Sequence, residues 1–232
     1  CLSIVDAVTS LGGVPVLVDA WGADAVYSGS QKCLSCTPGL SPITFSDKAI
    51  ATVKARTHKC QSWFLDLNLL LGYWGETTRT YHHTAPTNSL YALHESLLML
   101  QQEGLKNAWA RHQRNHQALK AGLSQLDINF VVNEQDRLPQ LNSIHIPAGL
   151  DEKQVRADLL QQHGIEIGAG LGALAGKIWR IGLMGYSSRV ENVISCLQAL
   201  ESVLRQQGMN CPEGIAVAAA YRSYAQQAQQ TK

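Results

Sequence analysis

Short, continuous apolar runs separated by Gly, Ser and Pro fill the first 45 residues, and this pattern constrains the fold more than any other feature. Runs of Val, Ile and Leu that do not alternate with polar residues are typical of strands buried on both faces of a parallel sheet. We therefore expect strands of an α/β sheet here. The runs are Leu2–Val8, Val14–Val18, Asp24–Ser28 and Pro42–Phe45.

Helical periodicity replaces this pattern from Asp47 onward, where Asp47 is expected to act as an N-cap. Apolar residues then recur at the spacing of one helix face. The long helical stretch is a natural domain boundary. The expected helices cover residues 47–57, 87 or 88 to 104, and 105–126.

The remaining sequence alternates strand and helix patterns in the order β-β-α-β-β-α, which indicates an α+β arrangement with its own core. The expected strands are Ile128–Val132, Asn142–Ile146, Ile165–Gly168 and Lys177–Leu183, and the expected helices are Glu152–His163 and Arg189–Gln206. The Gln-rich end predicts a weakly helical or frayed tail. The predicted division is residues 1–104, residues 105–207 and a tail at 208–232.

Charge and composition exclude several kinds of partner. The sequence has 19 Lys and Arg against 18 Asp and Glu, so its net charge of +1 creates no basic field to attract nucleic acid or an anionic membrane. The most apolar stretch, Trp63–Trp74, is interrupted by polar residues and falls short of the roughly 20 residues that span a bilayer. Six irregularly spaced cysteines indicate reduced thiols, so we expect a cytoplasmic protein by default.

Two polar residues lie where open α/β sheets bind ligands. Lys32 follows the small residues 28–30 and Gln31, and a partly desolvated amine there can form a Schiff base. Asp6 lies in an apolar run, where a carboxylate requires a cationic or donor partner. The residues alone leave open an ordinary surface lysine and a helix N-cap at Asp6. Together they suit pyridoxal phosphate, which needs a carboxylate at its ring nitrogen and an amine at its aldehyde.

Five motifs, in order from residue 1 to about residue 206, give the chain a family resemblance. They are Asp6–Gly13, Tyr27–Lys32, Pro38–Gly39, Tyr81–Thr84 and Arg180–Gly182. The chain resembles the alanine:glyoxylate/serine:pyruvate aminotransferases, which are class-V, fold-type I pyridoxal-phosphate enzymes. The resemblance implies an α/β fold in which residues 1–104 are the C-terminal part of the cofactor-binding large domain. That domain has a mainly parallel sheet with helices, and residues 105–207 form a small α+β domain that begins with a long connecting helix.

The resemblance implies roles for four side chains at the cofactor, pyridoxal 5'-phosphate. Asp6 would pair with the pyridinium nitrogen, and Val8 would pack on one face of the ring. Gln31 would hydrogen-bond the cofactor phosphate. Lys32 would hold the cofactor as a Schiff base and move a proton between the substrate α-carbon and the cofactor.

Further roles implied by the resemblance concern the substrate and a second subunit. Tyr81 and Thr84 would reach across a homodimer interface to the partner subunit's phosphate, so the active sites would be shared. Arg180 would bind the substrate α-carboxylate in bidentate geometry. No metal site is expected, because adjacent histidines such as His82 and His83 point apart in an extended segment.

The implied activity is transfer of an amino group from a small amino acid, alanine or serine, to a 2-oxo acid, glyoxylate or pyruvate, by a ping-pong mechanism through Lys32. Ureidoglycine:glyoxylate and aminophosphonate transaminases are alternatives of the same fold. Family members carry a phosphate loop and a ring-stacking aromatic residue before this stretch, so we expect an N-terminally truncated member. A fragment that only dimerises or binds cofactor weakly is another alternative. A nicotinamide-binding domain is disfavoured, because residues 11–13 lack the G-x-G-x-x-G pattern.

Overall fold

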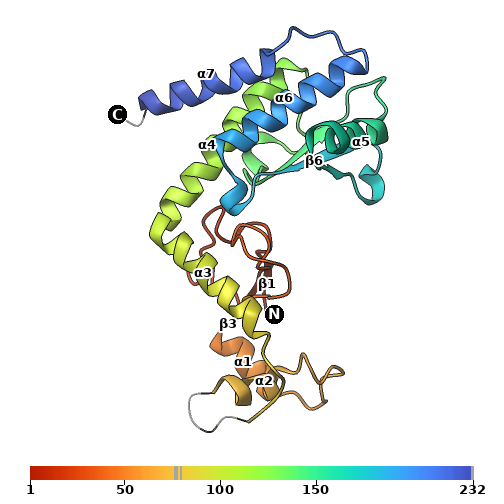
Figure 1. The fold of residues 1–232 in the computed structure, drawn as a ribbon. Helices are drawn as coiled ribbons and strands as arrows, with labels where there is room; N and C mark the ends of the chain where they lie inside the picture. The colour runs from red at the N-terminus through yellow and green to blue at the C-terminus, as the bar shows by residue number, and fades with distance from the viewer. Residues whose placement is uncertain (76–77, 79, 231–232) are drawn as a thin grey trace.

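The computed structural model describes residues 1–75, 78 and 80–230. Figure 1 shows an N-terminal region and a C-terminal region connected by a long helical arm. The arm consists of α3 (Thr87–Glu103) and α4 (Leu105–Gln125), which meet at Gly104. Gly104 has a φ of 81°, a left-handed conformation that glycine adopts without steric cost. A single glycine therefore sets the angle between the two helices of the arm.

A mixed sheet forms the centre of the N-terminal region. Parallel pairing of β1 with β2 brings Asp6 opposite Tyr27, and β2 pairs with β3 in the antiparallel direction. Helices α1 and α2 follow the sheet. The elements are β1 (Ile4–Asp6), β2 (Ala25–Tyr27), β3 (Ile43–Phe45), α1 (Asp47–Lys54) and α2 (Leu67–Trp74).

The buried carboxylate of Asp24 ties this sheet to the helix that follows it. Asp24 accepts hydrogen bonds from the Ser3 N–H at 2.9 Å and the Ser46 hydroxyl at 2.9 Å, and Lys48 lies 3.2 Å away. The hydrogen bonds from Ser3 and Ser46 lower the pKa of Asp24 to about 2. Sequence reasoning assigned this residue no role, because its partners come from three separate segments.

The sequence prediction for the start of α1 is wrong by one residue. The N-cap is Ser46, whose hydroxyl accepts the Ala49 N–H at 3.1 Å, and Asp47 is the first helical residue. The helix ends at Lys54, before the predicted limit at residue 57. Serine and aspartate are both good N-caps, so their order in the sequence did not distinguish them.

Two further expectations for the N-terminal sheet are wrong. The run Val14–Val18 is not a strand, because Pro15 lacks a backbone donor, and Val16 and Val18 pack instead against the cluster that contains Val26. The strands are also not buried on both faces: Ile4 is 72% exposed and Ile43 is 46% exposed.

The C-terminal region combines an antiparallel sheet with packed helices. The sheet order is β4-β6-β5, and α4, α6 and α7 pack against one another. Trp179 of β6 is fully buried within this core. The elements are β4 (Leu141–His145), α5 (Glu152–His163), β5 (Gly168–Ala169), β6 (Ile178–Gly182), α6 (Val190–Gln206) and α7 (Ile215–Gln230).

Three predictions for the C-terminal region need correction. The expected strand Ile165–Gly168 is replaced by the two-residue β5, Gly168–Ala169, which shares only Gly168 with it. Residues 128–132 form only an isolated bridge, between Phe130 and Ile144, instead of a strand. The tail is a helix, α7, which buries Ala216 and Ala220 against the core. Its first turn is fixed by the buried carboxylate of Glu201, which accepts backbone N–H groups from residues 214 and 216. The division at residues 104 and 207 stays a prediction.

Candidate active site

Asp6 is the last residue of β1, and both of its carboxylate oxygens accept hydrogen bonds. One oxygen accepts the Val8 N–H at 2.9 Å, and the other accepts the Tyr27 hydroxyl at 2.8 Å. These bonds, the one from Val8 foremost, lower the pKa of Asp6. Residues 8–10 form a turn, so Asp6 does not cap a helix there. The strand therefore presents an ionised carboxylate at its carboxyl end.

Tyr27 is the partner of Asp6 that sequence reasoning missed. The hydrogen bond to Asp6 raises the pKa of the Tyr27 phenol, which remains protonated and donates to the carboxylate. Tyr27 was part of a recognised motif but had no assigned role. The sequence did hold a signal for this contact: Tyr27 ends the strand next to the one that Asp6 ends, and parallel strands bring their carboxyl ends to one edge of the sheet.

Val8 and Gln31 converge on Gly29, beside Asp6. A Cβ at Gly29 would lie 2.8 Å from Gln31 Oε1 and 3.5 Å from Val8 Cγ1. Gly29 is buried, and no side chain fits at position 29 without moving Gln31, so Val8 and Gln31 pack against the backbone of the segment that leads to Lys32. The structure thus brings Asp6, Val8 and Gln31 together, as the sequence predicted for one site.

The lysine-bearing segment is fixed by buried serines on either side of Gly29. The Ser28 hydroxyl donates to Ala7 O at 3.0 Å, which ties the segment to the end of β1. The Ser30 hydroxyl donates to Thr37 O at 2.7 Å. Lys32 is half-buried, and its ammonium makes no hydrogen bond or ion pair within the part of the chain that the structure describes. The amine is therefore held on a rigid loop without a competing partner.

Arg180 lies on β6 of the C-terminal region and is half-buried. Its Nε donates to Ala169 O at 2.8 Å, which anchors the guanidinium. A Cβ at Gly168 would lie 3.4 Å from both Nε and Nη2, so glycine leaves room for the guanidinium plane. Among residues 1–75, 78 and 80–230, the terminal nitrogens of Arg180 make no hydrogen bond, and they remain able to bind a carboxylate.

Tyr81 and Thr84 are not brought to the Asp6 cluster. Their hydroxyls lie 2.8 Å apart and hydrogen-bond each other, and Tyr81 is 77% exposed. Between them, His82 is buried and stacks on Trp63 with ring centroids 4.1 Å apart. The expectation that His82 and His83 point apart is wrong, because their Nδ1 atoms lie 2.8 Å from each other. The predicted contact of Tyr81 and Thr84 with a partner subunit stays a prediction.

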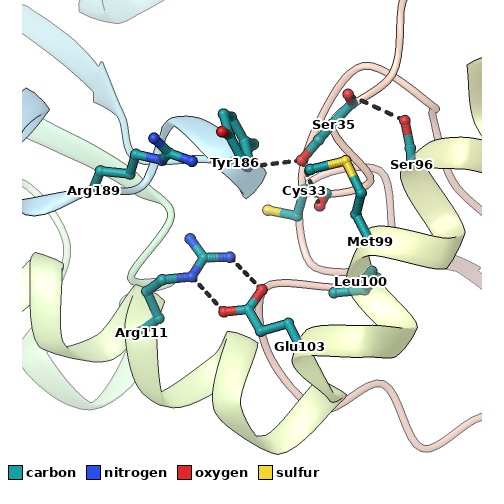
Figure 2. A pocket seen from close by; sticks show the side chains of 9 residues that line it. All are labelled: Cys33, Ser35, Ser96, Met99, Leu100, Glu103, Arg111, Tyr186 and Arg189. Carbon is teal, nitrogen blue, oxygen red and sulfur yellow. Dashed lines mark hydrogen bonds and ion pairs between the residues drawn. The ribbon is translucent and has the colours of Figure 1, made fainter.

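A cavity of about 270 Å³ lies beside the lysine-bearing segment, between Cys33, α3, α4 and the turn after β6. Figure 2 shows that Arg111 and Glu103 face each other across its floor. Cys33 donates its thiol hydrogen to Thr9 O, and burial raises the pKa of the thiol to about 11. Within the described residues there is no group of three or more His, Cys, Asp or Glu placed to hold a metal ion. No described helix is long and apolar enough to cross a membrane.

Comparison with known proteins identifies the family. Residues 1–193 match the family described as aminotransferase class-V. The chain belongs to this family. It is 39% identical to the (S)-ureidoglycine–glyoxylate transaminase of Bacillus subtilis, over 96% of this chain and 58% of that protein. It is 41% identical to the alanine–glyoxylate aminotransferase of Rattus norvegicus, over 92% of this chain and 51% of that protein.

A solved class-V structure shows the same fold. The crystal structure of alanine–glyoxylate aminotransferase from Nostoc sp. matches with a TM-score of 0.86 and 52% sequence identity, covering 88% of this chain and 54% of that one. The predicted family and α/β fold class are therefore confirmed. The chain spans about half the length of these relatives, since it covers 51–58% of them.

Class-V aminotransferases are pyridoxal-phosphate enzymes, and the residues described here fit that cofactor. The ionised Asp6 suits a protonated ring nitrogen. Val8, whose N–H bonds to the Asp6 carboxylate, offers an apolar side chain to a flat ring, and the exposed Gln31 amide can donate to a phosphate. The unpaired amine of Lys32 suits an aldehyde. When bound, this cofactor supplies an electron sink for negative charge at the substrate α-carbon.

Proposed function

We propose that this chain forms part of an aminotransferase that moves the amino group of a small amino acid, alanine or serine, to glyoxylate or pyruvate. The observation that carries the proposal is the pairing of Asp6 with Tyr27 at the carboxyl ends of β1 and β2, next to the rigid loop that presents Lys32. Glyoxylate is favoured as the acceptor, because it appears in the names of both curated relatives described above.

Side chains at and after the strand ends of the N-terminal sheet would each bind or act on a different part of the cofactor. Asp6 holds the ring nitrogen protonated through its negative charge, while the Tyr27 hydroxyl fixes the carboxylate orientation. Val8 covers one ring face, and the Gln31 amide binds phosphate oxygens. The Lys32 amine takes a proton from the substrate α-carbon and returns it on the cofactor side.

The remaining assigned residues would bind the substrate and complete a shared site. Arg180 holds the substrate α-carboxylate with its free terminal nitrogens, which orients the α-carbon hydrogen. Tyr81 and Thr84 contact the phosphate of a partner subunit in a homodimer. Their exposure and their separation from the Asp6 cluster support this role.

A second candidate donor is (S)-ureidoglycine. The relative from Bacillus subtilis matches 96% of this chain at 39% identity, nearly the same similarity as the alanine–glyoxylate aminotransferase of Rattus norvegicus. Comparing turnover with alanine, serine and ureidoglycine, each with glyoxylate as acceptor, distinguishes the two candidates.

The decisive test is Lys32→Ala in the complete natural protein loaded with pyridoxal phosphate. We expect the visible absorption of the lysine-bound cofactor to disappear, and turnover to fall by roughly 10²–10⁴-fold, the usual contribution of a positioned acid–base group. Lys54→Ala, at an exposed lysine at the end of α1, is the matched control and should leave both unchanged. Retention of the absorption band and of turnover in Lys32→Ala would contradict the proposal.

A further inference from the structure

The backbone of Gly185, in the turn Gly185–Ser187 that follows β6, is held from both sides by α4. Its N–H donates to His112 Nε2 at 2.9 Å, and its carbonyl accepts from Arg111 Nη1 at 2.7 Å. His112 is fully buried, and its Nδ1 lies 2.6 Å from Ala108 O. Because a carbonyl only accepts, Nδ1 carries the proton and Nε2 is left to accept. The two hydrogen bonds together define the position of Gly185.

Arg111 connects the same turn to the end of α3. Its Nε and Nη2 donate to the two carboxylate oxygens of Glu103 at 2.5 and 2.8 Å, as Figure 2 shows. Its Nη1 also donates to Ser188 O at 2.8 Å. Glu103 immediately precedes Gly104, the joint between α3 and α4. The guanidinium is therefore engaged within the chain and is not free to bind an anion in the adjacent cavity.

The turn packs directly on the lysine-bearing segment. Gly185 has a φ of 56°, and a Cβ there would lie 2.0 Å from Ser35 Oγ and 3.2 Å from the carbonyl oxygen of Lys32 itself. The next residue, Tyr186, donates its N–H to Ser35 Oγ at 2.7 Å. At its other end, the turn continues from the strand that carries Arg180. The turn Gly185–Ser187 therefore contacts the loop that carries Lys32 and follows the strand that carries Arg180.

We propose that Arg111 and His112 are positioning residues that set the distance between the Lys32 amine and the Arg180 guanidinium. We call Glu103, Arg111, His112, Gly185 and Ser35 the Gly185 junction. The inference rests on the proposed function, in which Lys32 acts at the α-carbon and Arg180 holds the α-carboxylate of one substrate. Because those two groups lie on different regions of the chain, a rigid contact between the regions is needed to hold the reacting geometry.

The test compares substitutions at two buried histidines on the same helix, in the complete natural protein. His112→Leu keeps bulk but removes the acceptor for Gly185, while the amide of His112→Gln can donate to Ala108 O and accept from Gly185. The control is His116→Leu: His116 is also buried, one turn further along, but its Nδ1 bonds to Asn142 Oδ1 at 2.6 Å. All three variants are measured for thermal midpoint, pyridoxal-phosphate affinity and steady-state kinetics.

We expect His112→Leu to raise KM for the amino donor about tenfold and to lower kcat as well, with cofactor affinity changed less than about threefold, since a displacement of reacting groups near 1 Å can cost up to about 10²-fold in rate. His112→Gln should recover most of this loss. His116→Leu should lower the thermal midpoint without raising the donor KM. Amide hydrogen exchange at Gly185, measured without cofactor, should accelerate in His112→Leu but not in His112→Gln or His116→Leu.

The possible results distinguish failure of the Gly185 junction, failure of its positioning role and failure of the proposed function. An unchanged Gly185 exchange rate in His112→Leu would overturn the junction, whatever the cofactor does. Faster exchange with an unchanged donor KM would overturn the positioning role. A wild-type protein without visible lysine-bound cofactor absorption would overturn the proposed function instead, and the exchange data identify that case because they do not depend on the cofactor.

Discussion

The C-terminal region buries a continuous apolar core between its sheet and the helices α4, α5, α6 and α7, whereas the N-terminal region buries a small cluster of Ala7, Ala23 and Val26. In the N-terminal region, the segments are connected by a hydrogen bond that the Asp24 carboxylate accepts and by hydrogen bonds that the Ser28 and Ser30 hydroxyls donate. Large apolar side chains remain exposed there. They include Trp21, Trp63, Phe64, Leu65 and Trp74, which are 51–69% exposed.

This difference shows that most of the proposed site residues lie in the region with less packing of its own. Asp6 and Lys32 belong to the hydrogen-bonded N-terminal region, and Arg180 belongs to the packed C-terminal region. Hydrophobic burial supplies most of the stability of a domain. We therefore expect substitutions to affect the two regions unequally, and the following comparisons test that expectation.

The largest contrast should come from truncating one leucine in each region. Leu197 of α6 is fully buried, so Leu197→Ala should lower the free energy of unfolding by about 2–5 kcal/mol. Leu65 is 69% exposed, so Leu65→Ala should change it by less than about 0.5 kcal/mol. Urea denaturation at two protein concentrations measures both. Equal losses would remove the contrast, and a concentration-dependent loss for Leu65→Ala would show that a second subunit covers that surface.

A smaller effect is expected at the buried glutamate that holds α7. Glu201 is 4% exposed and accepts N–H groups from Gly214 and Ala216, so Glu201→Ala should cost about 1.5–3 kcal/mol and speed amide exchange in residues 215–230. Glu213 provides the matched control, because its side chain is 84% exposed and pairs with Arg205 at the surface. Glu213→Ala should cost less than about 1 kcal/mol. Unaltered exchange of α7 in Glu201→Ala would be evidence against this anchor.

Acid should distinguish the regions by the pH at which each loses stability. Burial, with a smaller effect of nearby Arg111 and Arg137, lowers the pKa of His112 and His116 in the folded protein. The unfolded chain then binds more protons below the ordinary histidine pKa of about 6.5, so the stability of the C-terminal region should fall as pH drops below that value.

The N-terminal counterpart is Asp24, whose folded pKa of about 2 lies below the ordinary value of 3.8. The ionised Asp24 contributes fully to the stability of the folded protein when the pH is above its ordinary pKa of 3.8. This contribution is lost only as the pH falls from 3.8 toward 2. Amide exchange followed from pH 7.5 to pH 3 should therefore show loosening of the core around α4 before the β1–α1 contacts loosen. The reverse order would contradict the assignment, and Asp24→Asn should weaken the acid step of the N-terminal region without changing that of the C-terminal region.

Elements with complete local signals were predictable from the sequence. Helix α5 begins and ends at the predicted residues, because Asp151 caps it by accepting N–H groups and Gly164 closes it in the left-handed conformation. The family motifs likewise predicted that Asp6, Val8 and Gln31 lie close together, and the contacts around Gly29 agree with this. The role of the Lys32 side chain at that cluster stays a prediction. The strand predicted from local composition at Val14–Val18 is absent, because apolar residues next to Pro15 pack against the small N-terminal core instead of pairing in the sheet.

Long-range contacts could not be predicted in the same way. The bond from Gly185 to His112 joins residues 73 positions apart, and the bond from Tyr186 to Ser35 joins residues 151 positions apart. No local pattern marks His112 as an acceptor, because a buried histidine on an amphipathic helix has the same periodicity as a core residue. The sequence therefore indicated the candidate site residues, and only the fold shows the long-range contacts that hold the turn after β6.

The pairing of Asp6 with Tyr27 limits which changes of length the chain can tolerate. Side chains alternate between the two faces of a strand, so one residue inserted between Val5 and Asp6 would turn the carboxylate to the opposite face and away from the Tyr27 hydroxyl. Gly22, in the connection between β1 and β2, is exposed and has no atom within 4 Å of a built Cβ. Insertions and deletions should therefore be tolerated at that connection, while the strands on either side keep a fixed length.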